Sequence, residues 1–217
     1  MRKRITAALL CLMLSAGCIG AAEASAYQEL CEQRGLRSAE VIAWLEIPGA
    51  SICEPVMRHP EDDEYYAAHD AEGNESMNGA LYVQGQYNAD DFSDPVTLIY
   101  GGSSSETAPF GMLQELYSGS FDQCRTLQVH LPQKTSQYMV FAALPYSAIH
   151  ILHYYDFSIA RRFDSFFDGV FSTRALGMHL DKENRPAVGK DRVVVLSTGL
   201  RGDPLQRYLV MAREMIP

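Results

Sequence analysis

The sequence lacks the positive charge that a nucleic-acid-binding surface needs. Its 217 residues contain 18 Lys and Arg against 27 Asp and Glu, which gives a formal net charge of −9. Basic side chains cluster only in the first four residues, apart from the adjacent pair Arg161 and Arg162. Because phosphate backbones bind to clustered Lys and Arg, the composition excludes nucleic acid as a partner.

The sequence also lacks the short motifs of several common enzyme classes. It contains no glycine-rich dinucleotide fingerprint, P-loop, HExxH zinc motif or EF-hand loop. The GGSSS sequence at 101–105 only superficially resembles a GxSxG nucleophile elbow, because no helix pattern follows it directly. His150 and His153 follow no helical pattern. We therefore expect neither a metal site nor a cofactor.

Cysteine is scarce and lacks the spacing of a metal site. Of the five cysteines, Cys11 and Cys18 lie in the N-terminal segment, and Cys31, Cys53 and Cys124 form no CxxC pair. Buried free thiols are the expected state of these last three. One disulfide among them stays open as an alternative.

The first 26 residues are typical of a targeting segment. A basic MRKR start precedes an apolar run at 5–22, and the ASA triplet at 24–26 fits a cleavage site. Three fates stay open: cleavage after Ala26, lipid attachment at Cys18, or retention as a short membrane anchor. Each fate places the rest of the chain outside the cytoplasm, either secreted or attached to the membrane through this segment.

Strand patterns dominate the remaining chain. A short helical pattern at 27–42 is broken at Gly35, and residues 60–71 predict an acidic helical turn. Pro55 indicates an edge strand or a bulge. The predicted strands are 43–47, 51–57, 79–85, 95–101, 125–131, 137–144, 192–198 and a last one from about Arg207. About eight strands with few helices predict a mostly-β barrel or sandwich.

The strongest helical pattern runs from Ser158 to about Thr173. Its apolar residues repeat at helical spacing, four of them phenylalanines, which predicts a face packed on the core. Ser158 is a suitable N-cap. A shorter amphipathic helix is expected at 110–117.

Several segments, taken in order, resemble the class B sortases, which are cysteine transpeptidases of Gram-positive bacterial surfaces. The resemblance covers roughly residues 38–213. The matching segments are IAWLEIPGASICEPVMR (42–58), DEYYAAHD (63–70), GALYVQ (79–84), DFSDPVTLIYG (91–101), FGMLQELY (110–117) and VVVLST (193–198). The resemblance implies a closed barrel over residues 43–217, preceded by an N-terminal helical segment at 27–42.

The resemblance also locates the family's three catalytic positions. The histidine follows Tyr-Gly, the cysteine follows Leu-Ser-Thr, and the arginine begins the next strand. These positions correspond to Gly102, Gly199 and Arg207, so only the arginine is kept. The loop between Gly199 and Arg207 is also short for a class B member.

Loss of these two side chains removes the expected chemistry. Acyl transfer needs a nucleophile and a partner that activates it and protonates the leaving amine, and an arginine alone can only hold a carbonyl. We therefore expect a catalytically inactive pseudosortase that binds or scaffolds an extended sorting-signal peptide or a surface-assembly partner. The expected peptide-contacting residues are Ser197, Thr198, Tyr65, Tyr66, Tyr154 and Tyr155.

Two alternatives stay open. Ser197 shares a strand face with Gly199 and could replace the missing nucleophile. The chain could instead be a structural relic whose peptide groove, expected between the strand ends at Thr198 and Arg207 and the segment 146–157, has collapsed.

Overall fold

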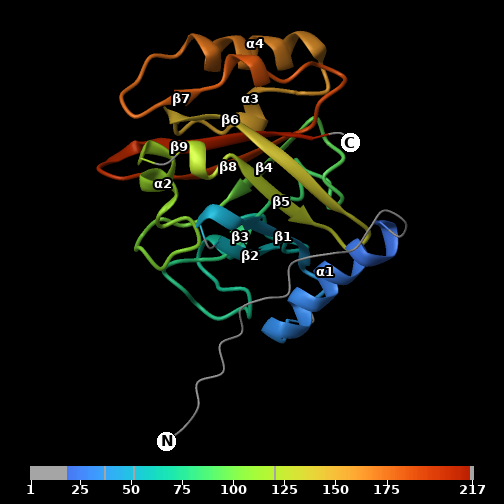
Figure 1. Cartoon of the computed structure of the whole chain (residues 1–217). Coiled ribbons are helices and arrows are strands. Elements are labelled where there is room, and N and C mark those ends of the chain that lie inside the picture. Colours follow the sequence, from blue (N-terminus) through green and yellow to red (C-terminus); the bar gives the residue numbers. More distant parts are fainter. Residues whose placement is uncertain (1–18, 37, 51, 120, 216–217) are drawn as a thin grey trace, which may run out of the picture.

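Nine strands form one sheet that closes on itself (Figure 1). The computed structural model describes residues 19–215 except 37, 51 and 120. The strands are β1 (Val41–Ile47), β2 (Ile52–Met57), β3 (Leu81–Tyr82), β4 (Val96–Tyr100), β5 (Thr126–His130), β6 (Thr135–Ser147), β7 (His179–Leu180), β8 (Val193–Leu200) and β9 (Asp203–Glu214). Their order is β5-β1-β2-β3-β4-β8-β9-β6-β7, and pairing of β5 with β6 closes the first eight strands. The predicted mostly-β barrel of about eight strands is confirmed, and β7 lies outside it.

Helices cover the barrel from several sides (Figure 1). The α-helices are α1 (Ile19–Arg34), α2 (Leu113–Gly119), α3 (Ile151–Tyr154) and α4 (Ala160–Ser172). Single 3₁₀ turns occur at Pro48–Ala50, Tyr65–Ala67, Phe121–Gln123 and Lys182–Asn184. Within residues 19–215, no helix is both long enough and apolar enough to cross a membrane. Residues 1–18 of the expected targeting segment 1–26, with Cys11 and Cys18, lie outside the described residues.

Two hydrophobic cores lie on opposite faces of the barrel wall. Val194 and Leu196 of β8 belong to the core inside the barrel, whereas Val193 and Val195 belong to the core outside it. Successive strand residues point to opposite faces, so a strand with no polar alternation is buried on both sides. This explains the unbroken apolar run of β8.

The outer core is closed by α4. Phe163, Phe166, Phe167 and Val170 of α4 are buried together with outward-facing residues of β6, β8 and β9. The predicted core face of this helix is therefore confirmed. Ser158 is not its N-cap, because Ile159 occupies that position and Ser158 instead donates to the Asp156 carboxylate.

Three predicted boundaries were wrong. In the segment 27–42 the predicted break at Gly35 is confirmed, since α1 ends at Arg34 and Gly35 has φ +68°, but its predicted end at 42 is wrong because residues from Val41 are strand. The segment 79–85 keeps only Leu81 and Tyr82 in the sheet, because the Asp63 carboxylate binds the N–H of Gly85 and Gln86 instead. The last strand begins at Asp203, since β8 and β9 form a tight hairpin.

Pro55 is buried but lies at an unpaired edge of β2, as predicted. On the side of β2 away from β1, the short β3 pairs only with Val56 and Met57. Arg34 donates to the Cys53 carbonyl at 3.2 Å on that side. The missing N–H of Pro55 therefore removes no strand pairing.

Candidate functional site

Four residues at the ends of three adjacent strands lie side by side on the outer face of the barrel. The sheet register pairs Tyr100 of β4 with Ser197 of β8, and Gly199 of β8 with Arg207 of β9. Ser197 and Gly199 have the parity of the outward-facing Val193 and Val195. The sheet thus brings the expected cysteine position beside the expected arginine, as the resemblance implies.

Arg207 is held by its neighbours in this row. Its Nε donates to Ser197 Oγ at 2.6 Å and its Nη2 donates to the Ser197 carbonyl at 3.1 Å. The guanidinium carbon lies 5.2 Å from the centroid of the Tyr100 ring, within cation–π range. The positive charge of Arg207 is therefore fixed in place beside the end of β8.

A chain of aromatic and polar contacts continues the row across the barrel. The Tyr100 ring stacks on Tyr82, with centroids 5.3 Å apart, and the Tyr82 hydroxyl donates to Glu64 at 3.0 Å. Burial raises the pKa of both phenols above its usual range, while the nearby Arg207 charge lowers it in part. Both tyrosines therefore stay protonated and act as neutral hydrogen-bonding groups.

Glu64 connects this row to the segment before α3. Gln84 Nε2 donates to Glu64 at 2.5 Å, and Gln84 Oε1 lies 2.8 Å from His150 Nε2. His150 Nδ1 accepts the His153 backbone N–H at 3.1 Å, so the proton of a neutral His150 ring lies on Nε2. His150 is thus a helix N-cap with a bound side chain rather than a metal ligand.

Gly102 has no room for a side chain. A Cβ built there would lie 2.2 Å from the carbonyl oxygen of Asn78. The backbone on both sides is also fixed, because Gly101 N–H donates to the Ser197 carbonyl and Phe110 N–H donates to the Gly102 carbonyl. The expected histidine position is therefore occupied by another part of the backbone.

Gly199 has a neighbouring hydroxyl in place of a side chain. A Cβ at this position would meet only Ser103 Oγ, at 3.3 Å. Ser103 Oγ donates to the Gly199 carbonyl at 3.1 Å. The residue after Gly102 thus contacts Gly199, so the two expected catalytic positions lie next to each other.

The predicted contact residues on β8 are both buried. Ser197 and Thr198 are each 1% exposed. Thr198 lies on the other strand face and donates to the Gly101 carbonyl at 2.8 Å. Ser197 Oγ accepts from a guanidinium, an arrangement that lacks the base a hydroxyl nucleophile needs.

The predicted tyrosines are not gathered at Arg207. Tyr65 and Tyr66 line a separate pocket of about 360 Å³, where Tyr65 stacks between His59 and His69 and Tyr66 donates to Glu40. Tyr154 is 60% exposed on α3. Tyr155 packs edge-on against Phe166 of α4, and it lines a pocket of about 270 Å³.

Thiols lie at other places in the fold. Cys31, Cys53 and Cys124 are free, as expected, with no disulfide among them, but only Cys124 is buried, while Cys31 and Cys53 are partly exposed. Cys31 Sγ accepts from Trp44 at 3.2 Å, Cys53 pairs with Glu46 between β1 and β2, and Cys124 belongs to the inner core. Burial raises the pKa of Cys53 and Cys124, which disfavours the reactive thiolate. Among residues 19–215, no group of three or more His, Cys, Asp or Glu could hold a metal ion.

Sequence reasoning missed the groups that fill this site. Asn78, Ser103 and Tyr82 carried no pattern that would connect them to residues 199–207. Their role comes from contacts across long stretches of chain, such as Ser103 with Gly199, which only the folded barrel creates.

Comparison with solved structures identifies the fold. A mutant form of Clostridium perfringens sortase B superimposes with a TM-score of 0.72 at 18% identity, covering 87% of this chain and 89% of that one. B. anthracis sortase B in a complex gives 0.70 at 19% identity, covering 92% and 95%. A Staphylococcus aureus sortase B–substrate complex gives 0.69 at 17%, covering 90% and 94%.

Comparison of the sequence with family models and with curated proteins gives no match. The protein therefore has the sortase fold, and more narrowly the fold of the class B sortases.

Proposed function

We propose that this protein is a pseudosortase, which binds an extended peptide of the sorting-signal type, or the surface protein that carries it, without cleaving it. The observation that carries the proposal is that Gly199 pairs with Arg207 and that Gly102, just after β4, lies next to Gly199. A fold that supports peptide cleavage in class B sortases here holds two glycines beside a fixed arginine.

The site keeps binding groups and lacks reactive ones. Arg207 is partly exposed and offers a positive charge, and the buried, stacked rings of Tyr100 and Tyr82 pack beside it and help to fix its position. The pocket lined by Tyr155, Leu152 and Tyr87 lies on the segment after Tyr146, and Tyr146 pairs with Arg207 across β6 and β9. This combination supports recognition of a peptide by a strand end and a side-chain pocket.

Location follows from the expected targeting segment. We propose that the barrel acts outside the cytoplasm of a Gram-positive cell, near the cell wall, exported or attached to the membrane through residues 1–26. The binding partner would then be a neighbouring surface protein. Binding would serve surface assembly or its regulation and not peptide transfer.

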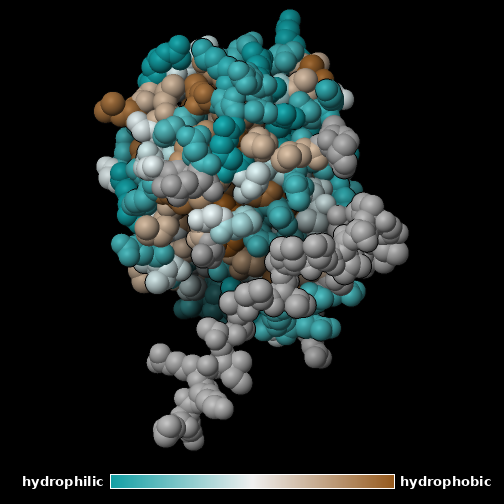
Figure 2. Space-filling view, viewed as in Figure 1, coloured by the Kyte–Doolittle hydropathy of each residue, from teal (hydrophilic) through white to brown (hydrophobic). Residues whose placement is uncertain are grey.

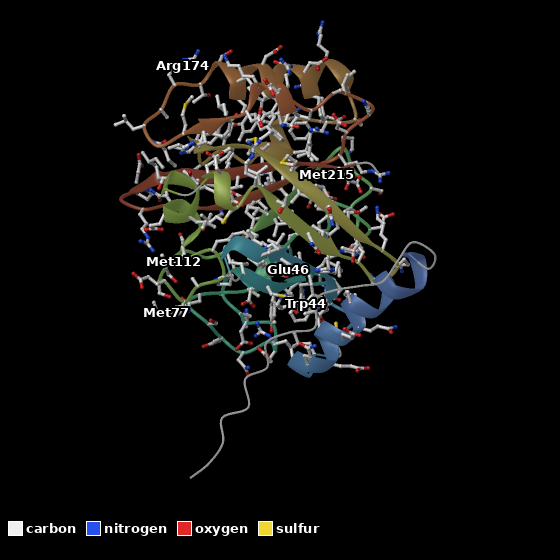
Figure 3. All side chains as sticks on the ribbon, in the orientation of Figure 1. Trp44, Glu46, Met77, Met112, Arg174 and Met215 are labelled. Atoms are coloured by element: carbon white, nitrogen blue, oxygen red, sulfur yellow. The ribbon has the colours of Figure 1, made fainter. Side chains whose placement is uncertain are left out.

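Peptide binding and peptide cleavage, measured on the same sample, test the proposal. Fluorescent sorting-signal peptides of the class B type should bind without release of a cleaved product. Arg207→Ala should weaken that binding, because it removes the fixed charge of the row. Arg174→Ala is the matched control: Arg174 is exposed, donates to the backbone carbonyls of Ser172 and Thr173, and lies at the α4 side of the molecule (Figure 3).

Two results would contradict the proposal. Cleavage above the buffer rate that disappears in Ser197→Ala would favour an active hydrolase with a serine nucleophile. If the unmodified protein and both arginine variants bind none of the peptides, the result would favour a structural relic.

A further inference from the structure

One long stretch of the chain carries negative charge without any positive charge. Residues 59–124 contain thirteen Asp and Glu and neither Lys nor Arg. Much of this stretch is exposed loop, including Glu72, Glu75 and Glu106. Basic side chains from elsewhere pair with some of these acids, as Arg201 does with Glu115, but Glu106 has no ion pair among the described residues.

Within this stretch, two exposed methionines flank a groove. Met77 is 94% exposed and Met112 is 45% exposed, and Figure 3 places both on the same side of the molecule. Ser76 and Asn78, on either side of Met77, line a groove of about 380 Å³ together with Met112. The face shown in Figure 2 is largely hydrophilic with scattered hydrophobic areas, and two exposed thioethers beside one groove give it adaptable apolar contact area.

The groove is lined by polar side chains (Ser76, Asn78 and Thr107), by apolar side chains and by two carboxylates. Ile52, Pro109 and Met112 supply the apolar lining, and Glu54 and Glu106 supply the carboxylates. Glu54 has a single ion pair, to Arg34 at 3.4 Å. Burial raises the pKa of Glu54, and Arg34 offsets that effect only in part. A further cation beside Glu54 would therefore be stabilised.

We propose that this methionine-flanked groove (Ile52, Glu54, Glu106, Pro109 and Met112, with Met77 at its edge) docks a Lys- or Arg-rich, amphipathic segment of a partner protein. One apolar side chain of the segment lies on Met112 and Pro109. Its basic side chains extend to Glu54 and Glu106.

The lining chemistry selects this occupant. Among the described residues no group of three or more His, Cys, Asp or Glu could hold a metal ion, and the surrounding negative charge repels anionic membranes and nucleic acid. Long basic side chains combine an apolar stem with a cationic end, which matches a groove of this composition. The proposal does not depend on peptide binding at Arg207.

Fluorescence anisotropy with a short fluorescein-labelled peptide of Lys, Leu and Ala tests it on the full chain. One comparison peptide has Gln in place of every Lys, and a second has Ser in place of every Leu. The parent peptide should bind at low salt and both comparison peptides should bind at least about tenfold more weakly, since each lacks one half of the recognition. Equal binding by either comparison peptide would refute the proposal.

Matched variants locate the binding site. Glu54→Gln with Glu106→Gln should weaken parent-peptide binding about fivefold to tenfold, which corresponds to two partly exposed ion pairs. The control, Glu32→Gln with Glu183→Gln, makes the same charge change at exposed positions elsewhere and should change binding less than about twofold. An equal loss in both double variants would show a net-charge effect and overturn the assignment.

Two further variants complete the test. Met77→Ser with Met112→Ser should weaken binding without altering the charge, and unchanged binding would refute the apolar contact. Arg207→Ala should bind the basic peptide as the unmodified protein does, so failure of this proposal and failure of the peptide site at Arg207 give different results.

Discussion

Replacing Gly102 with alanine should destabilise the protein, whereas the same change at Gly199 should not. A Cβ at position 102 would lie 2.2 Å from the Asn78 carbonyl oxygen, far inside the usual contact separation of about 3.5 Å. Asn78 cannot move freely, because its side-chain oxygen accepts from Ser104 at 2.8 Å and from Ser105 at 3.0 Å.

The cost follows from these contacts. Overpacking of this kind costs about 1–3 kcal/mol, and each strained hydrogen bond adds about 1 kcal/mol. We expect Gly102→Ala to lower the free energy of unfolding by about 2–4 kcal/mol and the melting temperature by roughly 5–12 °C for a chain of this size.

Gly199 provides the matched comparison. A Cβ there meets only Ser103 Oγ, at 3.3 Å, and a serine side chain can rotate away. Because glycine within a strand is disfavoured relative to alanine by about 0.5–1 kcal/mol, Gly199→Ala should leave stability within about 0.5 kcal/mol of the unmodified protein.

Urea unfolding followed by circular dichroism measures both variants. Equal stability of the two alanine variants would refute the reasoning, because it would show that the Asn78 segment moves aside without cost.

The same contacts predict that Gly102→His combined with Gly199→Cys gives a less stable protein without peptide transfer. The new imidazole would have to displace the Asn78 backbone before it could reach the thiol.

Three further perturbations have clear expected results. Asn88→Ala should cost about 2–4 kcal/mol in urea unfolding, because the buried amide donates to the Val96 carbonyl at 2.9 Å and accepts the Leu98 N–H at 3.0 Å; a loss below about 1 kcal/mol would contradict this role. Burial raises the pKa of Tyr146 and Tyr208 to about 12, so their contribution to stability is complete below pH 10 and is lost as the pH rises from about 10 to 12. Phenolate absorbance near pH 10 in the folded protein that disappears in Tyr146→Phe or Tyr208→Phe would be the contrary result. Cys124 is 2% exposed and burial raises its pKa, so Ellman's reagent should label it only on unfolding, and rapid labelling of the native protein would argue against its position.

Local sequence patterns predicted the elements whose burial is uniform along their length. The strands at 95–101 and 192–198 and the phenylalanine-rich helix were recognised because most residues of each strand, and the residues of one helical face, are apolar. The 79–85 segment failed for the opposite reason. Its pattern is equally apolar, but Asp63 binds the backbone N–H groups that a longer strand would have used.

The site was predictable only in part. The register that pairs Gly199 with Arg207 follows from a hairpin, which is local in sequence. The Asn78 carbonyl that excludes a side chain at Gly102, and the Ser103 hydroxyl that bonds to the Gly199 carbonyl, come from loops whose conformations no periodic pattern encodes. Tyr65 and Tyr66 were assigned to the peptide site through resemblance alone, and the fold places them in another pocket.

The barrel has one narrow seam, since β3 and β4 share a single residue pair, Tyr82 with Tyr100. Further along β4, the side chain of Asn88 takes the place of a neighbouring strand. We expect local opening of the barrel to begin between β3 and β4. The amide hydrogen of Leu98 should therefore exchange faster than that of Val195 on β8. Tyr100 also contacts Arg207. A ligand that binds Arg207 should therefore stabilise the β3–β4 pairing, and slower amide exchange of Leu98 would show that the ligand is bound.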